Sequence, residues 1–122
     1  MSITVKRIYE APSPKDGYRV LVDRLWPRGL KRESAALDLW VKEVGPSNEL
    51  RQWFGHEPTR WEGFRHRYAG ELDAAPECWQ TLAEKARREH VTLLFGARDE
   101  EHNNAVALKA YLENYLSAHG SH

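Results

Sequence analysis

Residues 18–32 read Y-R-V-L-V-D-R-L-W-P-R-G-L-K-R, an apolar strand pattern that runs straight into a basic, tryptophan-bearing loop. The run Val20–Val22 is typical of a short strand that is buried on both faces, and the proline and glycine of the loop then break the regular pattern. Asp23, Arg24 and Arg28 therefore follow the end of a strand. Because ligands of open α/β sheets bind at strand ends, the sequence places a candidate binding site here.

Two further strands are predicted outside this stretch. The run Val91–Phe95 is the strongest strand pattern in the chain, and residues 3–9 alternate apolar and charged side chains. Turn residues at 11–17 join the first strand to Val20–Val22, and this connection is too short for a helical crossover. These two strands are therefore either an antiparallel pair or parallel with an irregular link.

The remaining apolar residues recur at helical spacing. Leu37, Trp40, Val41 and Val44 predict a short helix that ends near Gly45. Local start signals predict further helices from Ser47, Pro58, Pro76 and either Asn103 or Asn104.

Helices between and after short apolar strands predict an α/β fold, namely a small three-layer domain with a mostly parallel short sheet and helices packed on its faces. The 122 residues suffice for a single domain, residues 1–122. If the strands at Val20 and Val91 are parallel neighbours, the Asp23–Arg28 loop and the Gly96–Asn104 turn line one cleft.

Composition excludes several classes of protein. Lys+Arg and Asp+Glu number 18 each, and the resulting net charge of zero disfavours nucleic acid as a partner. The lone Cys78 excludes an internal disulfide and fits a reducing compartment. No signal peptide or membrane span is recognisable, so we expect a cytoplasmic protein without membrane contact.

Arginines of the basic loop are candidates for binding an anion. Arg24 and Arg28 can clamp a phosphate or carboxylate, because guanidinium groups bind planar oxyanions through two hydrogen bonds. An equally weighted alternative is that Arg24 pairs with a buried carboxylate such as Asp38 or Asp99 and fixes the loop. Trp26 lies off any helical stripe, and it can cover a ligand, stack on an arginine or fill the core.

Four residues are weak candidates for acid–base chemistry. Asp23 can act as a base, but orienting an arginine is the favoured role. Asp99 and His102 lie in the polar turn after the last strand, and His56 follows a glycine. For both histidines a surface or capping position is the more common one. Their spacing contains no short metal-binding motif and no phosphate-binding glycine loop occurs, so neither a metal nor a cofactor is expected.

Asn103 and Asn104 stand where the last helix is expected to start. Their amides can add donors to an anion site, together with the free N–H groups of the helix. Capping of the helix by one of the two is the favoured alternative.

Several separated motifs recur in the order found in one bacterial family. They are V-L-V-D-R-L-W-P-R-G, D-L-W-V-K-E, P-S-N-E-L-R-Q-W-F, R-W-E-G-F-R-H-R-Y-A-G-E-L and V-T-L-L-F-G-A-R-D-E-E-H-N-N-A. Through them the chain resembles, over nearly its whole length, the YeaO-like branch of the domain-of-unknown-function 488 family. The resemblance implies a compact three-layer α/β fold in bacterial cytoplasmic proteins and no particular activity. The broader family has a late loop with a Cys-His-Arg motif, which residues 96–104 replace without a cysteine, so thiol chemistry does not carry over.

Together these patterns predict a cytoplasmic protein with an anion-binding cleft for a phosphorylated or carboxylated small molecule. One alternative is a nucleic-acid-binding module that uses the basic loop and a basic helix face, with Trp26 stacking on a base. Another is a structural or partner-binding protein without catalytic activity, whose charged loop is an internal network of ion pairs. The sequence leaves open whether a reaction is catalysed and which oligomeric state forms.

Overall fold

The computed structural model of the chain describes residues 2–118, in which four parallel strands form one sheet of order β1-β4-β2-β3. The strands are β1 (Ser2–Arg7), β2 (Tyr18–Leu21), β3 (Leu39–Trp40) and β4 (His90–Phe95). The predicted α/β class with a parallel sheet is confirmed.

β4 occupies the middle of the sheet. Val91 pairs with Ile3 of β1 and with Tyr18 of β2, so β1 and β2 run parallel on either side of β4. The choice that the sequence left open between these two strands is thereby settled. From Val91 to Phe95 every residue is at most 1% exposed, which explains why all of them except Thr92 are apolar.

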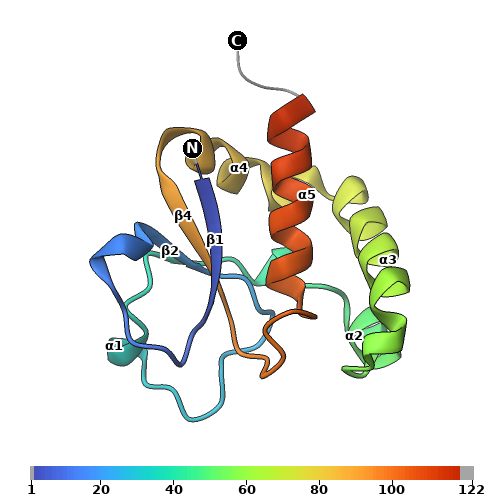
Figure 1. Cartoon of the computed structure of the whole chain (residues 1–122), viewed down its shortest axis with the longest axis horizontal. Coiled ribbons are helices and arrows are strands. Elements are labelled where there is room, and N and C mark those ends of the chain that lie inside the picture. Colours follow the sequence, from blue (N-terminus) through green and yellow to red (C-terminus); the bar gives the residue numbers. More distant parts are fainter. Residues whose placement is uncertain (1, 119–122) are drawn as a thin grey trace.

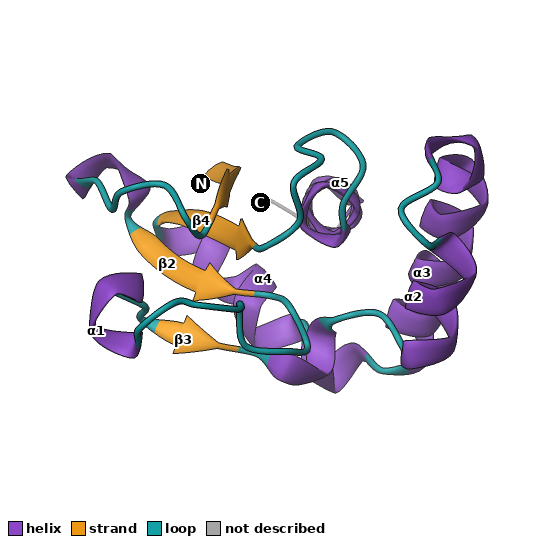
Figure 2. Cartoon of the chain, turned by 90° about the horizontal axis from the view of Figure 1, so that it is seen from below, coloured by secondary structure: helices purple, strands orange, loops and turns teal. Residues whose placement is uncertain are grey.

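Five α-helices pack around this sheet. They are α1 (Arg32–Ala35), α2 (Asn48–Phe54), α3 (Trp61–Ala74), α4 (Gln80–Arg88) and α5 (Asn104–Ala118). α4 and α5 contact β1 and β4, and the pair formed by α2 and α3 stands on the far side of α5 (Figures 1 and 2). None of the helices within residues 2–118 is long and apolar enough to cross a membrane.

Two apolar clusters lie on opposite faces of the sheet. Leu93 packs with the large helices in the main cluster, whereas Leu94 packs in a smaller cluster with Leu21 and Ile8. Neighbouring residues of one strand thus point to opposite faces. The smaller cluster is covered by Trp26, Leu30, Leu37 and Trp40 from the loops and from β3.

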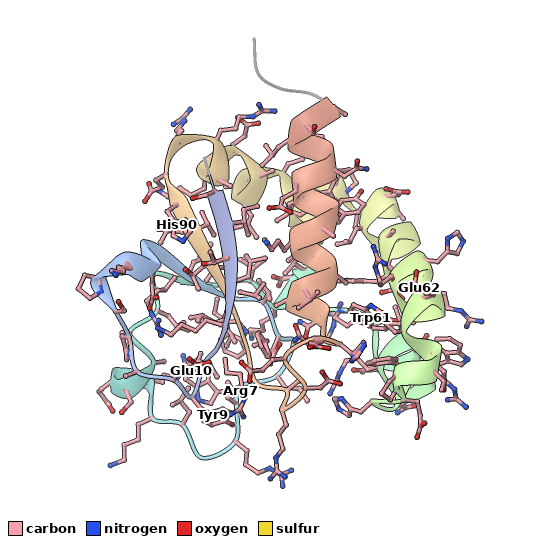
Figure 3. All side chains as sticks on the ribbon, in the orientation of Figure 1. Arg7, Tyr9, Glu10, Trp61, Glu62 and His90 are labelled. Carbon is pink, nitrogen blue, oxygen red and sulfur yellow. The ribbon has the colours of Figure 1, made fainter. Side chains whose placement is uncertain are left out.

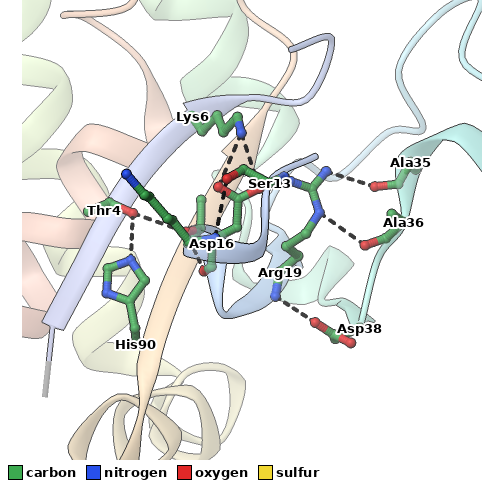
Figure 4. A network of polar contacts seen from close by, with 11 residues as sticks. Thr4, Lys6, Ser13, Asp16, Arg19, Ala35, Ala36, Asp38 and His90 are labelled. Carbon is green, nitrogen blue, oxygen red and sulfur yellow. Dashed lines mark hydrogen bonds and ion pairs between the residues drawn. The ribbon is translucent and has the colours of Figure 1, made fainter. Parts of the chain in front are cut away.

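A polar network lies on the face of the sheet that carries the smaller cluster, which we call the second face (Figure 4). The buried guanidinium of Arg19 donates to Asp16 Oδ2 and, over 2.8 Å, to the carbonyl oxygen of Ala35. Lys6 Nζ lies 3.1 Å from both carboxylate oxygens of Asp16. These contacts hold the 3₁₀ turn Pro14–Asp16 and the end of α1 against the sheet.

The helix predicted through Leu37 and Val44 is wrong. This segment forms the edge strand β3 and then a 3₁₀ turn, Lys42–Val44. Leu37 packs in the second cluster, whereas Val44 belongs to the main cluster on the other face of the sheet. A helix would bring both onto one side, and the backbone instead pairs with β2 through Asp38 N to Arg19 O and Val41 N to Leu21 O.

The other start signals are confirmed. Ser47 Oγ accepts a hydrogen bond from Leu50 N and caps α2, and Gly55 ends that helix in the left-handed conformation. Pro58 and Pro76 open 3₁₀ turns that lead into α3 and α4. α1 was not predicted from the sequence.

Candidate functional site

β2 and β4 end side by side, and the loops that follow them meet as predicted. Gly96 N donates a 2.8 Å hydrogen bond to Asp23 Oδ2. Asn104 Nδ2 lies 3.1 Å from both Asp23 Oδ1 and the carbonyl oxygen of Val22. The loop after β2, the end of β4 and the first residue of α5 therefore share one edge, at the lower end of the sheet in Figure 1.

A pocket of about 370 Å³ opens at this edge, between the two loops and α2. The candidate residues in its lining are Asp23, Arg24, His56, His102, Asn103 and Asn104. Three polar residues of α2 that were not predicted from the sequence also line the pocket, namely Asn48, Arg51 and Gln52. Apolar wall is supplied by Leu25, Pro46, Phe54, Phe64 and Ala97.

Arg24 is held by backbone carbonyls. Its Nε donates to Pro46 O over 3.0 Å and its Nη2 donates to Gly45 O over 2.6 Å. The pairing with Asp38 or Asp99 that we considered is not observed. The backbones of Arg24 and Gly45 approach closely, since a Cβ at Gly45 would lie 3.0 Å from Arg24 N. Arg24 therefore fixes the wall of the pocket that precedes α2.

Arg28 and Trp26 lie outside the pocket lining. Arg28 is exposed, and its carbonyl accepts a 2.8 Å hydrogen bond from the hydroxyl of Tyr9, which Figure 3 labels where the chain leaves β1. The rings of Trp26 and Trp40 pack edge-on with their centres 5.2 Å apart, and the Arg32 guanidinium lies 4.6 Å from the Trp26 ring centre. The expected clamp of two arginines from one loop is therefore not assembled.

Arg51 supplies the second cation of the pocket. Its side chain is exposed on α2, and its hydrogen bond runs to Asn48 Oδ1 over 3.2 Å. Within residues 2–118, no carboxylate oxygen lies within 4.0 Å of its guanidinium nitrogens. Glu71 of α3 orients α2, because it accepts hydrogen bonds from the N–H and hydroxyl of the cap Ser47.

His102 is oriented by Asp99. The Nδ1 atom of His102 lies 2.9 Å from Asp99 Oδ2, and the ring packs edge-on against Trp61 at the start of α3; Figure 3 labels Trp61 beside this helix. The Glu101 N–H and the His102 side chain hydrogen-bond to Asp99, and they lower the pKa of its carboxyl. Asp99 thus holds the His102 ring through Nδ1, and His102 belongs to the pocket lining.

Asp23 is a carboxylate in the pocket without an ionic partner. Burial raises the pKa of Asp23, and the hydrogen bonds from Gly96 and Asn104, together with the charge of Arg51, oppose this rise. Among the described residues, no Lys, Arg or His nitrogen lies within 4.0 Å of the Asp23 carboxylate. Asp23 therefore contacts no arginine directly, in contrast to the orienting role we favoured.

The remaining candidates have defined places. Asn103 is 3% exposed, and its Oδ1 accepts a 2.9 Å hydrogen bond from Val106 N, so it caps α5. His56 is exposed on the pocket wall and has a φ of 58°, a left-handed conformation that is uncommon for a residue with a side chain. In the described part of the chain, no three His, Cys, Asp or Glu side chains are grouped to hold a metal ion.

A family model described as "Inactive DUF488-N3 subclade" matches residues 2–121. The chain belongs to the DUF488 family. A relative in Escherichia coli, named "Uncharacterized protein YeaO", is 42% identical over 114 residues, which cover 93% of this chain and 99% of the relative. An uncharacterized protein of Mycobacterium tuberculosis is 47% identical over 70 residues, or 57% of this chain and 59% of the relative. No solved structure shows a significant match to this DUF488 chain.

Proposed function

We propose that the pocket binds a small molecule that carries a phosphate or carboxylate group. The observation that carries this proposal is the position of Arg51, whose exposed guanidinium lines the pocket without an internal carboxylate partner. Guanidinium groups without such a partner are suited to bind an oxyanion through two hydrogen bonds. His56 and His102 line the same pocket and can add donors.

The size and lining of the pocket agree with a small ligand. Its volume of about 370 Å³ falls at the lower end of the range of roughly 300–1,000 Å³ that is usual for ligand pockets. Phe54 and Phe64 pack on one another with ring centres 4.6 Å apart and ring planes tilted by 32°, and both supply apolar surface to the pocket lining. Such a combination favours a ligand with one charged end and an apolar body.

Binding is favoured over catalysis. The residues that line the pocket include no Ser, Thr, Cys, Lys or Tyr side chain, which are the usual nucleophiles. Of the acid–base candidates in the lining, Asp23 has both carboxylate oxygens engaged by internal donors, and His102 has its Nδ1 engaged by Asp99. The description of the matching subclade as inactive supports the same conclusion.

The nucleic-acid alternative has no comparable support. Its expected stacking platform, Trp26, already has Trp40 at its edge and the Arg32 guanidinium over its ring. Trp53 is likewise flanked by Arg60 and Arg67, with the Arg67 guanidinium 4.1 Å from its ring centre. An arginine of the chain already lies over each of these rings, where a base would have to stack.

Calorimetric titration with inorganic phosphate, methylphosphonate, acetate and benzoate tests the proposal. Arg51→Ala should weaken the binding of the responding anion by about 10-fold or more, the loss expected for one charge-assisted hydrogen-bonding partner. Arg28→Ala is the matched control, because it removes an exposed arginine that lies outside the pocket. The proposal fails if no anion binds to the wild type, or if both variants bind as the wild type does.

A further inference from the structure

We infer that the ligand of this pocket is zwitterionic, with a protonated nitrogen that binds the Asp23 carboxylate while its anionic group binds Arg51. This inference rests on the proposed function, since it specifies the chemistry of the molecule that the same pocket would take. It is carried by the arrangement of the charged groups around the pocket.

The Asp23 carboxylate has hydrogen-bond donors but no cation beside it among the described residues. A carboxylate removed from water is costly unless a cation or several donors accompany it. Asp23 receives two hydrogen bonds, from Gly96 N and from Asn104 Nδ2, and no ion pair from the described residues. The two neutral donors fix the direction of the carboxylate and leave its negative charge without compensation at short range.

Arg24, the cation next to Asp23 in the sequence, does not pair with it. Arg24 follows Asp23 in the chain, yet its guanidinium donates to the carbonyl oxygens of Gly45 and Pro46. Those two bonds hold the Arg24 side chain against the segment before α2. Arg24 is therefore not available to neutralise its neighbour unless the pocket wall rearranges.

The positive charge of Arg51 lies in the same pocket. Arg51 is the cation whose charge acts on the Asp23 carboxylate, and it belongs to the α2 wall of the pocket. It makes no ion pair within residues 2–118, just as Asp23 makes none. One pocket thus contains the Asp23 carboxylate and the Arg51 guanidinium, which form no ion pair with each other. Each of the two groups is hydrogen-bonded to neutral partners instead.

A ligand that carries both charges completes both groups at once. Its phosphate or carboxylate would pair with Arg51, and its protonated amine would donate to the free lone pairs of Asp23. A simple anion would satisfy Arg51 and be repelled by Asp23. The pocket should therefore discriminate between anions of equal size according to the presence of an ammonium group.

Matched ligand pairs test this inference on the wild-type protein. We would titrate 2-aminoethyl phosphate against ethyl phosphate, and 3-aminopropanoate against propanoate, by calorimetry at pH 7.5. In the pair that binds, the amine-bearing member should bind about 10-fold or more tightly, as expected for an added charge-assisted hydrogen bond. Equal affinities, or tighter binding of the simple anion, would overturn the inference and leave the proposed function standing. Absence of binding by all four probes would overturn both.

Asp23→Asn assigns the discrimination to its residue. This variant should reduce the preference for the amine-bearing probe to less than about 2-fold, because the negative charge is lost while the size is kept. Glu100→Gln is the control for a lost negative charge, since Glu100 is exposed and lies outside the pocket lining. A folded Asp23→Asn protein that keeps the full preference would contradict the role of Asp23. If the variant does not fold, the wild-type pairs alone decide.

Discussion

Gly96 donates its backbone N–H to Asp23 Oδ2 over 2.8 Å, and this bond joins the end of β4 to the loop that follows β2. It sets the direction of the Asp23 carboxylate at the edge where the pocket opens. The two loops that the sequence predicts as neighbours are thus connected through hydrogen bonds from Gly96 and Asn104 to a charged group, a class of hydrogen bond stronger than that between neutral groups.

Gly96→Ala should weaken this connection. A Cβ at residue 96 would lie 3.2 Å from Asp23 Oδ2, so the carboxylate or the loop must shift. We expect a loss of about 1 kcal/mol in the free energy of unfolding, measured by urea denaturation. Gly70→Ala is the control, because Gly70 lies in α3 with open space around its Cβ position, and there alanine should be neutral or stabilise by up to about 1 kcal/mol. Equal behaviour of the two variants would show that the close approach has no energetic consequence.

The second-face network predicts a loss of stability in acid. Although burial opposes ionisation, the hydrogen bonds from Ser13 N–H, Lys6 and Arg19 lower the pKa of Asp16 in the folded protein. A carboxyl whose pKa is lowered by folding contributes stability above its unfolded pKa of about 3.9, and this contribution is lost as the pH falls through the folded pKa. Asp16→Asn should therefore be destabilised by about 3 kcal/mol at pH 7, since it leaves buried Arg19 without its anion.

Urea denaturation between pH 7 and pH 3 checks this expectation. The difference between wild type and Asp16→Asn should shrink as the pH falls from about 4 toward the lower pKa of the folded carboxyl, because the unfolded chain takes up the proton first. Glu62→Gln is the control, because Glu62 forms an exposed ion pair with Arg65, and such pairs contribute at most about 1 kcal/mol. A difference for Asp16→Asn that is small, or that does not change with pH, would contradict the network.

Ala36→Gly should stabilise the protein. Ala36 ends α1 with φ and ψ of 49° and 48°, a left-handed conformation that costs an alanine about 1 kcal/mol and a glycine little. Its carbonyl, which accepts from Arg19 Nε, is unchanged by the substitution. We expect the free energy of unfolding to rise by about 0.5–1 kcal/mol in urea denaturation. A destabilised Ala36→Gly protein would show that the conformation is not strained.

The sequence predicts the fold well where a hydrophobic pattern fits a single type of element, as it does for the strand β4. The mostly apolar run of β4 arises from burial on both faces, and parallel pairing of β4 with β2 then places Asp23 beside Gly96. The segment around Leu37 and Val44 misleads for a physical reason. Its apolar spacing matches a helix, but the two residues pack on opposite faces of the sheet, which spacing alone does not reveal.

The candidate site is predicted only in part. Asp23, Arg24, His102 and the two asparagines lie at strand and helix ends, where local sequence patterns point to them. Arg51 lies on a helix face that reads as ordinary solvent-exposed surface, because the contact that orients α2 joins Ser47 to the distant Glu71. Trp26 and Arg28 are close to Asp23 in sequence, but the loop turns onto the second face, where Trp26 Nε1 donates to Leu30 O.

Backbone ¹H–¹⁵N chemical shifts recorded during titration with inorganic phosphate test the central claim most directly. We expect the shifts to change at the pocket, above all at Arg51, His102 and Asn104, and those of Arg28 and Lys31 to stay unchanged. Saturating changes of this kind should disappear in Arg51→Ala. A spectrum that does not change, or that changes only in the basic loop around Arg28, would contradict an anion-binding pocket between the two loops and α2.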